Sequence, residues 1–146
     1  MSESRSLRAR DIMSTDVRCV GEQETLRDAA RMMRDLRVGA LPICGEDQRL
    51  KGVVTDRDIT IRCSAEDRDP ASVRAGEMGG ALYWIDSEAG VEDVLSTMER
   101  EQIKRLPVID VPNGHRLIGM ISEADIAKNL GDEHIAQFVE RVYATA

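Results

Sequence analysis

The chain has 146 residues, of which 42% are hydrophobic and 32% charged, and its formal net charge is −7. This composition is typical of a soluble globular protein, and the length suits one compact body or two small units that share a core. The negative charge and the 3% aromatic content argue against nucleic acid and anionic membranes as partners. We expect a cytoplasmic protein, because no apolar run has the length of a membrane span and the N-terminus lacks a signal-peptide pattern.

The first half of the chain alternates strand and helix patterns. Residues 17–20 (VRCV) predict a short strand, and Thr25 with Asp28 has the spacing of a capping box that opens a helix. Four apolar residues at i, i+3, i+4 and i+7 form one stripe on this helix: Leu26, Ala29, Ala30 and Met33. Gly39 is expected to end it. Two strands, a second helix and a charged linker then follow, at about residues 40–43, 50–55, 56–65 and 66–75.

The second half repeats the first. Pro107 follows Pro42 by 65 positions, and the segment GVVTDRDI at Gly52 recurs as GMISEADI at Gly119, 67 positions later. Two residues are therefore inserted between the proline strand and this motif in the second copy. The matching helix stripe consists of Val91, Val94, Leu95 and Met98. A chain that repeats itself once in the same order predicts two similar units.

We predict an α/β (α+β) fold of two β-α-β-β-α repeats related by pseudo-two-fold symmetry, with a C-terminal helix added. A right-handed crossover makes the first two strands of each unit parallel. The expected boundaries are residues 7–66 for the first repeat, 67–74 for a linker, 75–130 for the second repeat and 131–146 for the C-terminal helix. That helix has its own apolar stripe, which must cover apolar surface of its own chain or of a second subunit: Ile135, Phe138, Val139 and Val142.

A Thr/Ser-x-x-Asp motif ends the Gly-started strand of each repeat, at Thr55 to Asp58 and at Ser122 to Asp125. One interpretation is a plain capping box, in which hydroxyl and carboxylate bind backbone N–H groups of their own helix. The other is a ligand site, because a helix N-terminus attracts phosphate and an aspartate one turn later can accept both hydroxyls of a ribose. The presence of two copies, each behind a Leu-Pro strand, favours the second interpretation.

These motifs resemble those of tandem CBS domains, the Bateman module, from Arg10 to about Leu130. The shared features are DIM at Asp11, the segments GALPI and KRLPVI, and the two motifs just described. Among such pairs the chain is most similar to small stand-alone hypoxic-response-type CBS proteins, which share GALPICG, a TDRDI segment and an HxxxQFV helix.

The resemblance implies a regulatory, non-enzymatic protein that binds AMP, ADP, ATP or a related adenosyl ligand between the repeats and requires no cofactor. Asp58 and Asp125 would hold ribose, and Thr55 and Ser122 would lie beside phosphate. The first motif is favoured because it includes Arg57, where the second has Ala124. The residues that would frame the base are Val17, Val20, Ala40, Leu41, Pro42, Leu82, Ile85, Arg105, Leu106 and Pro107.

Other functions are weighed against this one. Nothing in the sequence resembles a nucleophile elbow, a metal triad or a P-loop, so we do not expect an enzyme. A dimeric, stress-linked scaffold that binds a protein and no nucleotide is the main alternative, favoured if the two motifs are only caps. In either case we expect a homodimer, as the family resemblance implies, and an unidentified protein partner.

The three cysteines lack the spacing of a zinc site, and His115 and His134 are expected to be solvated. Cys19 and Cys44 end two strands that a right-handed crossover makes parallel, so both side chains reach the same end of the sheet. Neighbouring strands lie about 4.8 Å apart, a separation that permits a disulfide. Reduced thiols remain the other possibility in a cytoplasmic protein, and Cys63 is expected to stay unpaired.

Overall fold

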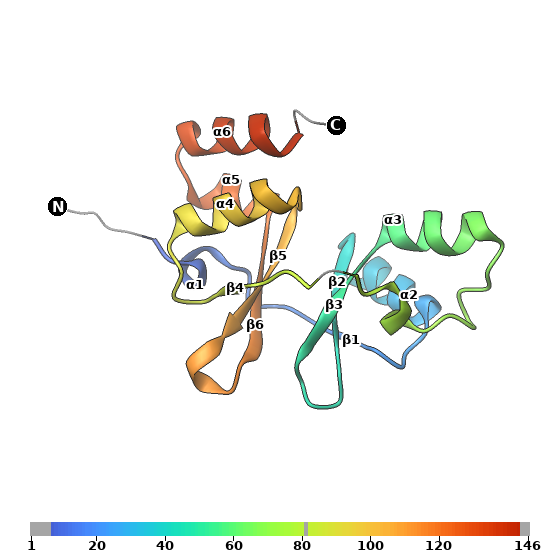
Figure 1. Ribbon diagram of the computed structural model, residues 1–146. Coiled ribbons are helices and arrows are strands. Elements are labelled where there is room, and N and C mark those ends of the chain that lie inside the picture. Colours follow the sequence, from blue (N-terminus) through green and yellow to red (C-terminus); the bar gives the residue numbers. More distant parts are fainter. Residues whose placement is uncertain (1–6, 81, 144–146) are drawn as a thin grey trace. The chain divides into compact units, whose positions relative to one another are not determined.

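A computed structural model describes residues 7–80 and 82–143 (Figure 1). The chain forms two compact units. The first unit comprises Val17–Tyr83, and the second combines the N-terminal segment up to Asp16 with the chain from Trp84 onward. Each unit contains one three-stranded sheet, so the mixed helix and strand content that the sequence predicts is confirmed.

The first unit is built on a sheet in the order β1-β2-β3, with β1 parallel to β2 and β2 antiparallel to β3. The parallel pair confirms the predicted crossover through α2. Buried side chains of the sheet and α2 form the core, among them Val20, Leu26, Met33, Leu41 and Val54. The elements are β1 (Val20–Gly21), α2 (Leu26–Leu36), β2 (Ala40–Cys44), β3 (Leu50–Thr55), α3 (Asp56–Asp58), η1 (Ile59–Cys63), η2 (Ser64–Glu66) and η3 (Ala75–Met78).

Helix α2 starts where its sequence predicts. Thr25 Oγ1 accepts the N–H of Asp28, and a carboxylate oxygen of Asp28 accepts the N–H of Thr25, both at 3.1 Å. These bonds from Thr25 hold the pKa of Asp28 below its usual value. The expected end at Gly39 was wrong, because the helix stops at Leu36 and Arg37 takes the left-handed conformation, with φ of 59°. Left-handed caps favour glycine but also accept other residues.

The second unit has the same topology, with sheet order β4-β5-β6 and the same parallel and antiparallel pairs. The predicted stripe of α4 is buried at all four positions. A short helix, α1, comes from the N-terminal segment of this unit and was not predicted. The elements are α1 (Ala9–Ile12), β4 (Ile85–Asp86), α4 (Val91–Glu101), β5 (Arg105–Asp110), η4 (Val111–Asn113), β6 (Arg116–Ser122), α5 (Glu123–Asn129) and α6 (Asp132–Tyr143).

The two inserted residues of the second repeat lengthen its hairpin. Strand β5 has six residues where β2 has five, and β6 has seven where β3 has six. The extra pair is Asp110 opposite Arg116. Both hairpins shift register at equivalent positions, after Ile43 and after Val108. The insertion therefore lies at the hairpin tip and leaves the strand ends that carry the motifs unchanged.

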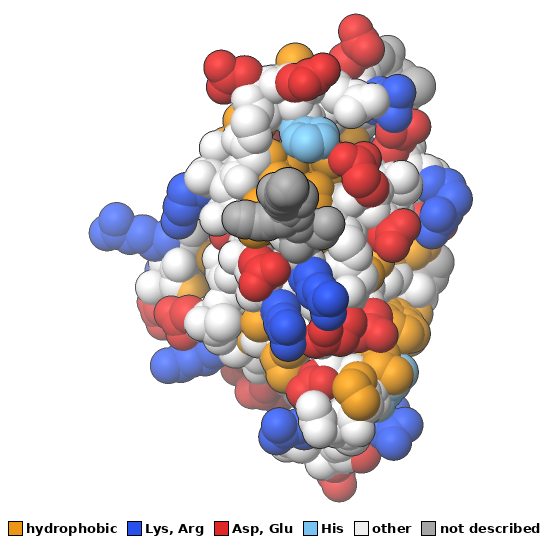
Figure 2. All heavy atoms as spheres, turned by 90° about the vertical axis from the view of Figure 1, so that its left-hand side faces the viewer, with side chains coloured by type: hydrophobic (Ala, Val, Ile, Leu, Met, Phe, Trp, Pro, Cys, Tyr) orange, Lys and Arg blue, Asp and Glu red, His pale blue; other side chains and the backbone are white. Residues whose placement is uncertain are grey.

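Helix α6 packs on α4 of its own unit. Phe138 and Val142 are buried, whereas Val139 of the predicted stripe is 50% exposed and does not belong to the buried face. Two polar contacts flank the apolar one, a hydrogen bond between His134 and Glu92 at 2.9 Å and an ion pair of Arg141 with Glu99 at 3.0 Å. On the face of the molecule in Figure 2, acidic and basic side chains are mixed and hydrophobic side chains form only scattered patches.

The packing units differ from the predicted domain boundaries. Residues 7–16 were assigned to the first repeat but pack with the second, where Ala9 N–H donates to Ala89 O and Arg10 N–H to Ser87 O. Residues 67–83 pack with the first unit, where Ala75 N–H donates to Glu24 O. The predicted linker is therefore bound to the first unit along much of its length, and Val73 and Ala75 are part of the core.

A disulfide joins Cys19 to Cys44, with the two Cα atoms 5.7 Å apart. Cys44 lies at the end of β2 and Cys19 directly before β1, so the predicted strand at 17–20 is shorter than expected. The bond connects the two parallel neighbours of the first sheet, as their predicted positions allow. Cys63 is a free, buried thiol whose Sγ contacts the carbonyl oxygen of Arg68 at 3.4 Å.

Candidate functional site

The first Thr/Ser-x-x-Asp motif is a capping box between β3 and α3. Asp58 Oδ2 accepts hydrogen bonds from Thr55 N at 2.8 Å and from Thr55 Oγ1 at 3.0 Å. In return, Thr55 Oγ1 accepts the N–H of Asp58 at 3.0 Å. Asp58 Oδ1 receives no hydrogen bond from any residue that the structure describes, and Arg62 Nη1 lies 3.6 Å from it. One carboxylate oxygen thus holds the helix cap, and the other remains available.

The second motif repeats this cap between β6 and α5. Asp125 Oδ2 accepts hydrogen bonds from Ser122 N at 2.9 Å and from Ser122 Oγ at 3.0 Å. Its other oxygen differs from that of the first motif, because Oδ1 accepts a hydrogen bond from Ser14 Oγ at 2.7 Å. The capping interpretation of the motif is therefore confirmed in both copies. The ribose-binding role of the two aspartates stays a prediction.

The two aspartates also differ in exposure. The Asp58 side chain is 22% exposed, whereas residue Asp125 is 5% exposed. Arg57 is exposed beside the first motif and makes no ion pair within the described residues, so its guanidinium is available to an anion. At the second motif, Glu123 lies 3.5 Å from Arg105. A carboxylate with a free, accessible oxygen and nearby cations is found only at the first motif of the two.

The register of each sheet brings the Leu-Pro strand to the motif. Ala40 is the partner of Thr55 in the first sheet, and Arg105 is the partner of Ser122 in the second. Of the other predicted contacts, Val17, Leu82 and Arg105 are at least partly exposed. Seven are buried, so a ligand would meet backbone rather than side chains there: Val20, Ala40, Leu41, Pro42, Ile85, Leu106 and Pro107.

Three residues beside the motifs were missed by the sequence analysis. Ser14 contacts Asp125, and Arg62 lies beside Asp58 and donates to the carbonyl oxygen of Met78 at 3.0 Å. Gly80, two residues after Met78, is the sequence counterpart of Ser14. The sequence does contain a signal for Ser14 and Gly80. The segment RARDIMS at Arg8 matches RAGEMGG at Arg74, 66 positions later, and extends the repeat N-terminal to the helices in which it was recognised.

The histidines have partners within their unit and are not simply solvated. The rings of His115 and Trp84 form an edge-to-face pair with centroids 5.0 Å apart, and His134 pairs with Glu92. In the part of the chain that the structure describes, no three His, Cys, Asp or Glu side chains gather as a metal site. Within the same residues, no helix is long and apolar enough to cross a membrane.

Comparison with known proteins identifies the family. The model of the CBS domain matches residues 9–64 and 76–132. Hypoxic response protein 1 of Mycobacterium tuberculosis is 48% identical over 135 residues, which cover 92% of each chain. A crystal structure of Hypoxic Response Protein I with two coordinated zinc ions, also 48% identical, superposes with a TM-score of 0.78 over 86% of this chain and all of that chain.

Two further relatives show where such modules occur. A CBS domain protein of Pyrobaculum aerophilum, solved in complex with AMP, superposes with a TM-score of 0.77 over 96% of this chain and all of that chain; at 22% identity it shows the fold alone. Homoserine O-acetyltransferase of Methanosphaerula palustris is 35% identical over 84% of this chain, but the match covers only 24% of that enzyme. The chain belongs to the CBS-domain family and contains two CBS domains in tandem.

Proposed function

We propose that this chain is a regulatory CBS pair that binds an adenine nucleotide and signals to a separate protein in the cytoplasm. The observation that carries the proposal is Oδ1 of Asp58, which accepts no hydrogen bond within the described residues and belongs to a side chain that is 22% exposed. Arg62 lies 3.6 Å from this oxygen, and Arg57 is exposed one residue before Asp58. Ribose hydroxyls are hydrogen-bond donors that an ionised carboxylate accepts well. The AMP complex of the Pyrobaculum protein supports the choice of ligand class for this fold.

The roles of the residues follow from their chemistry. Asp58 Oδ1 accepts a ribose hydroxyl while Oδ2 maintains the cap with Thr55. Arg57 and Arg62 neutralise phosphate, and their forked guanidinium groups suit its oxygens. The adenine lies against the exposed Leu82 and the backbone of β2 next to Thr55. No bond is made or broken in this role, so the proposed output is a change in how the protein binds its partner.

The test is calorimetric titration with AMP, ATP, NAD and S-adenosylmethionine at up to millimolar concentration. The variant Asp58→Asn keeps an amide oxygen for the cap but replaces the free carboxylate oxygen with an NH₂ group. We expect it to weaken AMP binding at least about tenfold, since a hydrogen bond to a charged group contributes about 1.5–3 kcal/mol. Asp125→Asn is the matched control and should leave the affinity unchanged, because that carboxylate is already satisfied.

A ligand-free scaffold is the second candidate, because two observations favour it. Both motifs are complete helix caps, which explains their residues without any ligand. The Cys19–Cys44 disulfide also offers a redox-sensitive element in the first unit. If wild-type protein gives neither heat nor a melting shift with any of the four ligands, the scaffold function replaces the nucleotide function.

A further inference from the structure

Each repeat is preceded in sequence by a lead segment that packs on the other repeat's unit. The two lead segments are residues 8–14 and 74–80, which correspond at an offset of 66. Arg10 N–H donates to Ser87 O, and Gly76 N–H donates to Glu22 O, both at equivalent positions of the two units. The first residues of the segments, Arg8 and Arg74, form equivalent bridges to the residue before the helix.

The lead segments also meet equivalent glycines of the sheets. A Cβ atom on Gly119 would collide with Met13, and one on Gly52 would lie 2.9 Å from the Cα atom of Gly79. Met13 and Gly79 are themselves equivalent at the offset of 66. The correspondence therefore holds to the penultimate residue of each segment and makes Gly80 the counterpart of Ser14.

At this last position the two segments differ. Ser14 pairs with β6 through two backbone hydrogen bonds to Met120, of 2.9 and 3.0 Å, and its hydroxyl donates to Asp125 Oδ1 at 2.7 Å. Gly80 has no hydroxyl, and within the described residues it makes no backbone hydrogen bond to β3. A Cβ atom built on Gly80 would meet no atom within 4 Å. The position that Ser14 fills in the second unit is therefore occupied in the first by a residue with no side chain and with open space around its Cα atom.

We propose that Ser14 is an internal plug that closes the second motif to nucleotide and confines binding to the first motif, one nucleotide per chain. The Ser14 hydroxyl makes the same bond that a ribose hydroxyl would make, so it occupies the acceptor position of Asp125. Its backbone bonds to β6 hold it there and leave Asp125 only 5% exposed. Gly80 leaves Asp58 Oδ1 without such a donor. This inference rests on the proposed nucleotide function.

The experiment compares the AMP stoichiometry of wild type and Ser14→Gly by calorimetry, with thermal melting to show that both are folded. Wild type should bind one AMP per chain and Ser14→Gly two, and the added site should be lost with Asp125→Asn but not with Asp58→Asn. Ser14→Thr retains a hydroxyl and serves as the control, which should stay at one.

Each outcome separates the two proposals. A stoichiometry that stays at one in Ser14→Gly overturns the plug and leaves the nucleotide function intact. No binding to wild type but one AMP bound to Ser14→Gly supports the plug and overturns nucleotide binding at Asp58. No binding to either protein overturns both. As a second variant, Gly80→Ser in the otherwise wild-type chain should lower the affinity for AMP at least tenfold relative to wild type. Gly80→Ala adds a Cβ without a hydroxyl and should not lower the affinity.

Discussion

Cys19 and Cys44 show how a residue-level feature can be derived from strand direction alone. Their positions at the same end of two parallel neighbours made a bond possible, and the structure contains it with 5.7 Å between the Cα atoms. Sequence could not decide between bond and free thiols, because that choice depends on the redox environment of the protein.

We predict that denatured, unreduced protein contains one reactive thiol, Cys63, and that Cys63→Ser contains none. Reduction should lower the free energy of unfolding of the first unit by about 3.5 kcal/mol, the value that the chain-entropy model gives for a sequence separation of 25 residues. Thiol counting and chemical unfolding with and without reductant measure the two quantities. Three reactive thiols in the unreduced protein would contradict the bond.

The aspartates of the two motifs illustrate what sequence could and could not predict about the site. The caps at Thr55 and Ser122 were predictable, because hydroxyl and carboxylate stand three residues apart in a local pattern. The contact of Ser14 with Asp125 joins residues 111 positions apart and depends on how the lead segment packs. No local pattern encodes such a contact, so only the repeat of the lead segments could have pointed to it.

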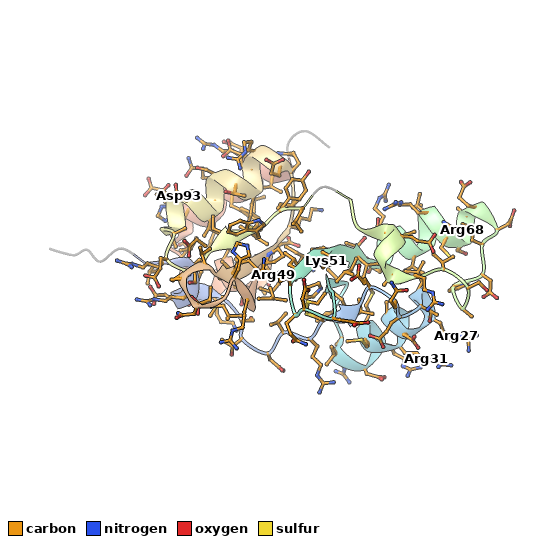
Figure 3. The ribbon with its side chains drawn as sticks, turned by 60° about the horizontal axis from the view of Figure 1, so that its bottom comes forward. Arg27, Arg31, Arg49, Lys51, Arg68 and Asp93 are labelled. Carbon is orange, nitrogen blue, oxygen red and sulfur yellow. A yellow bond between two sulfur atoms is a disulfide. The ribbon has the colours of Figure 1, made fainter. Side chains whose placement is uncertain are left out.

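At the scale of elements, α2 and α4 occupy equivalent positions but have opposite charges. Arg27 corresponds to Glu92 and Arg34 to Glu99, each 65 positions later. His134 and Arg141 of α6 are spaced seven residues apart, as are the two glutamates with which they pair. At the equivalent positions of α2, the side chains of His134 and Arg141 would meet arginines. The charges therefore select α4 as the docking surface of α6, and Arg27 and Arg31 project outward from α2 in Figure 3.

Apolar burial, more than the ion pairs, fixes α6 on α4. The ion pairs are largely exposed, and such pairs contribute about 0–1 kcal/mol. Phe138 is 5% exposed and its neighbour Val139 is 50% exposed. The periodicity of the sequence placed Phe138 and Val139 on one apolar stripe. Because the two residues are adjacent, the pattern alone does not show which of them faces the core. The helix expected at residues 131–146 is present as Asp132–Tyr143, and residues 144–146 lie outside the described residues.

Replacing these two neighbours tests the docking of α6. We predict that Phe138→Ala lowers the free energy of unfolding by about 3 kcal/mol, at the lower end for a buried phenylalanine, because α6 can detach in part. Val139→Ala, the matched control, should change it by less than about 0.5 kcal/mol. Chemical unfolding gives both values, and hydrogen exchange of the α6 amides should accelerate only in the first variant. Equal effects of the two substitutions would contradict the observed orientation of the helix.

For the molecule as a whole, the sequence repeat predicted the secondary structure of both units but not which chain segments pack together in each unit. The strands and main helices recur at fixed offsets, so the same pattern had to fold twice. The lead segments belong to the repeat that they precede in the family match, at residues 9–64 and 76–132, yet each packs in the unit that holds the strands and helices of the other repeat. Their helical parts are only four residues long, and backbone hydrogen bonds to Ser87 and Glu22 hold them within their units.

The homodimer is the remaining prediction at this scale. Helix α4 is covered by α6 of its own unit, and Val38, just after the end of α2, is 43% exposed. We propose that α2 contributes the dimer contact, since exposed apolar side chains beside partly buried ones are typical of interfaces. Light scattering should then give about twice the chain mass of 16.2 kDa.

A charged substitution at the contact makes the dimer prediction specific. Val38→Asp should shift the population to single chains at micromolar concentration, because burying the carboxylate at an interface without a partner costs several kcal/mol. Val111, 37% exposed in the turn before β6, provides the control, and Val111→Asp should leave the mass unchanged. Wild-type protein with the mass of one chain over a wide concentration range would rule out the dimer. A dimer that persists in Val38→Asp would move the contact away from α2.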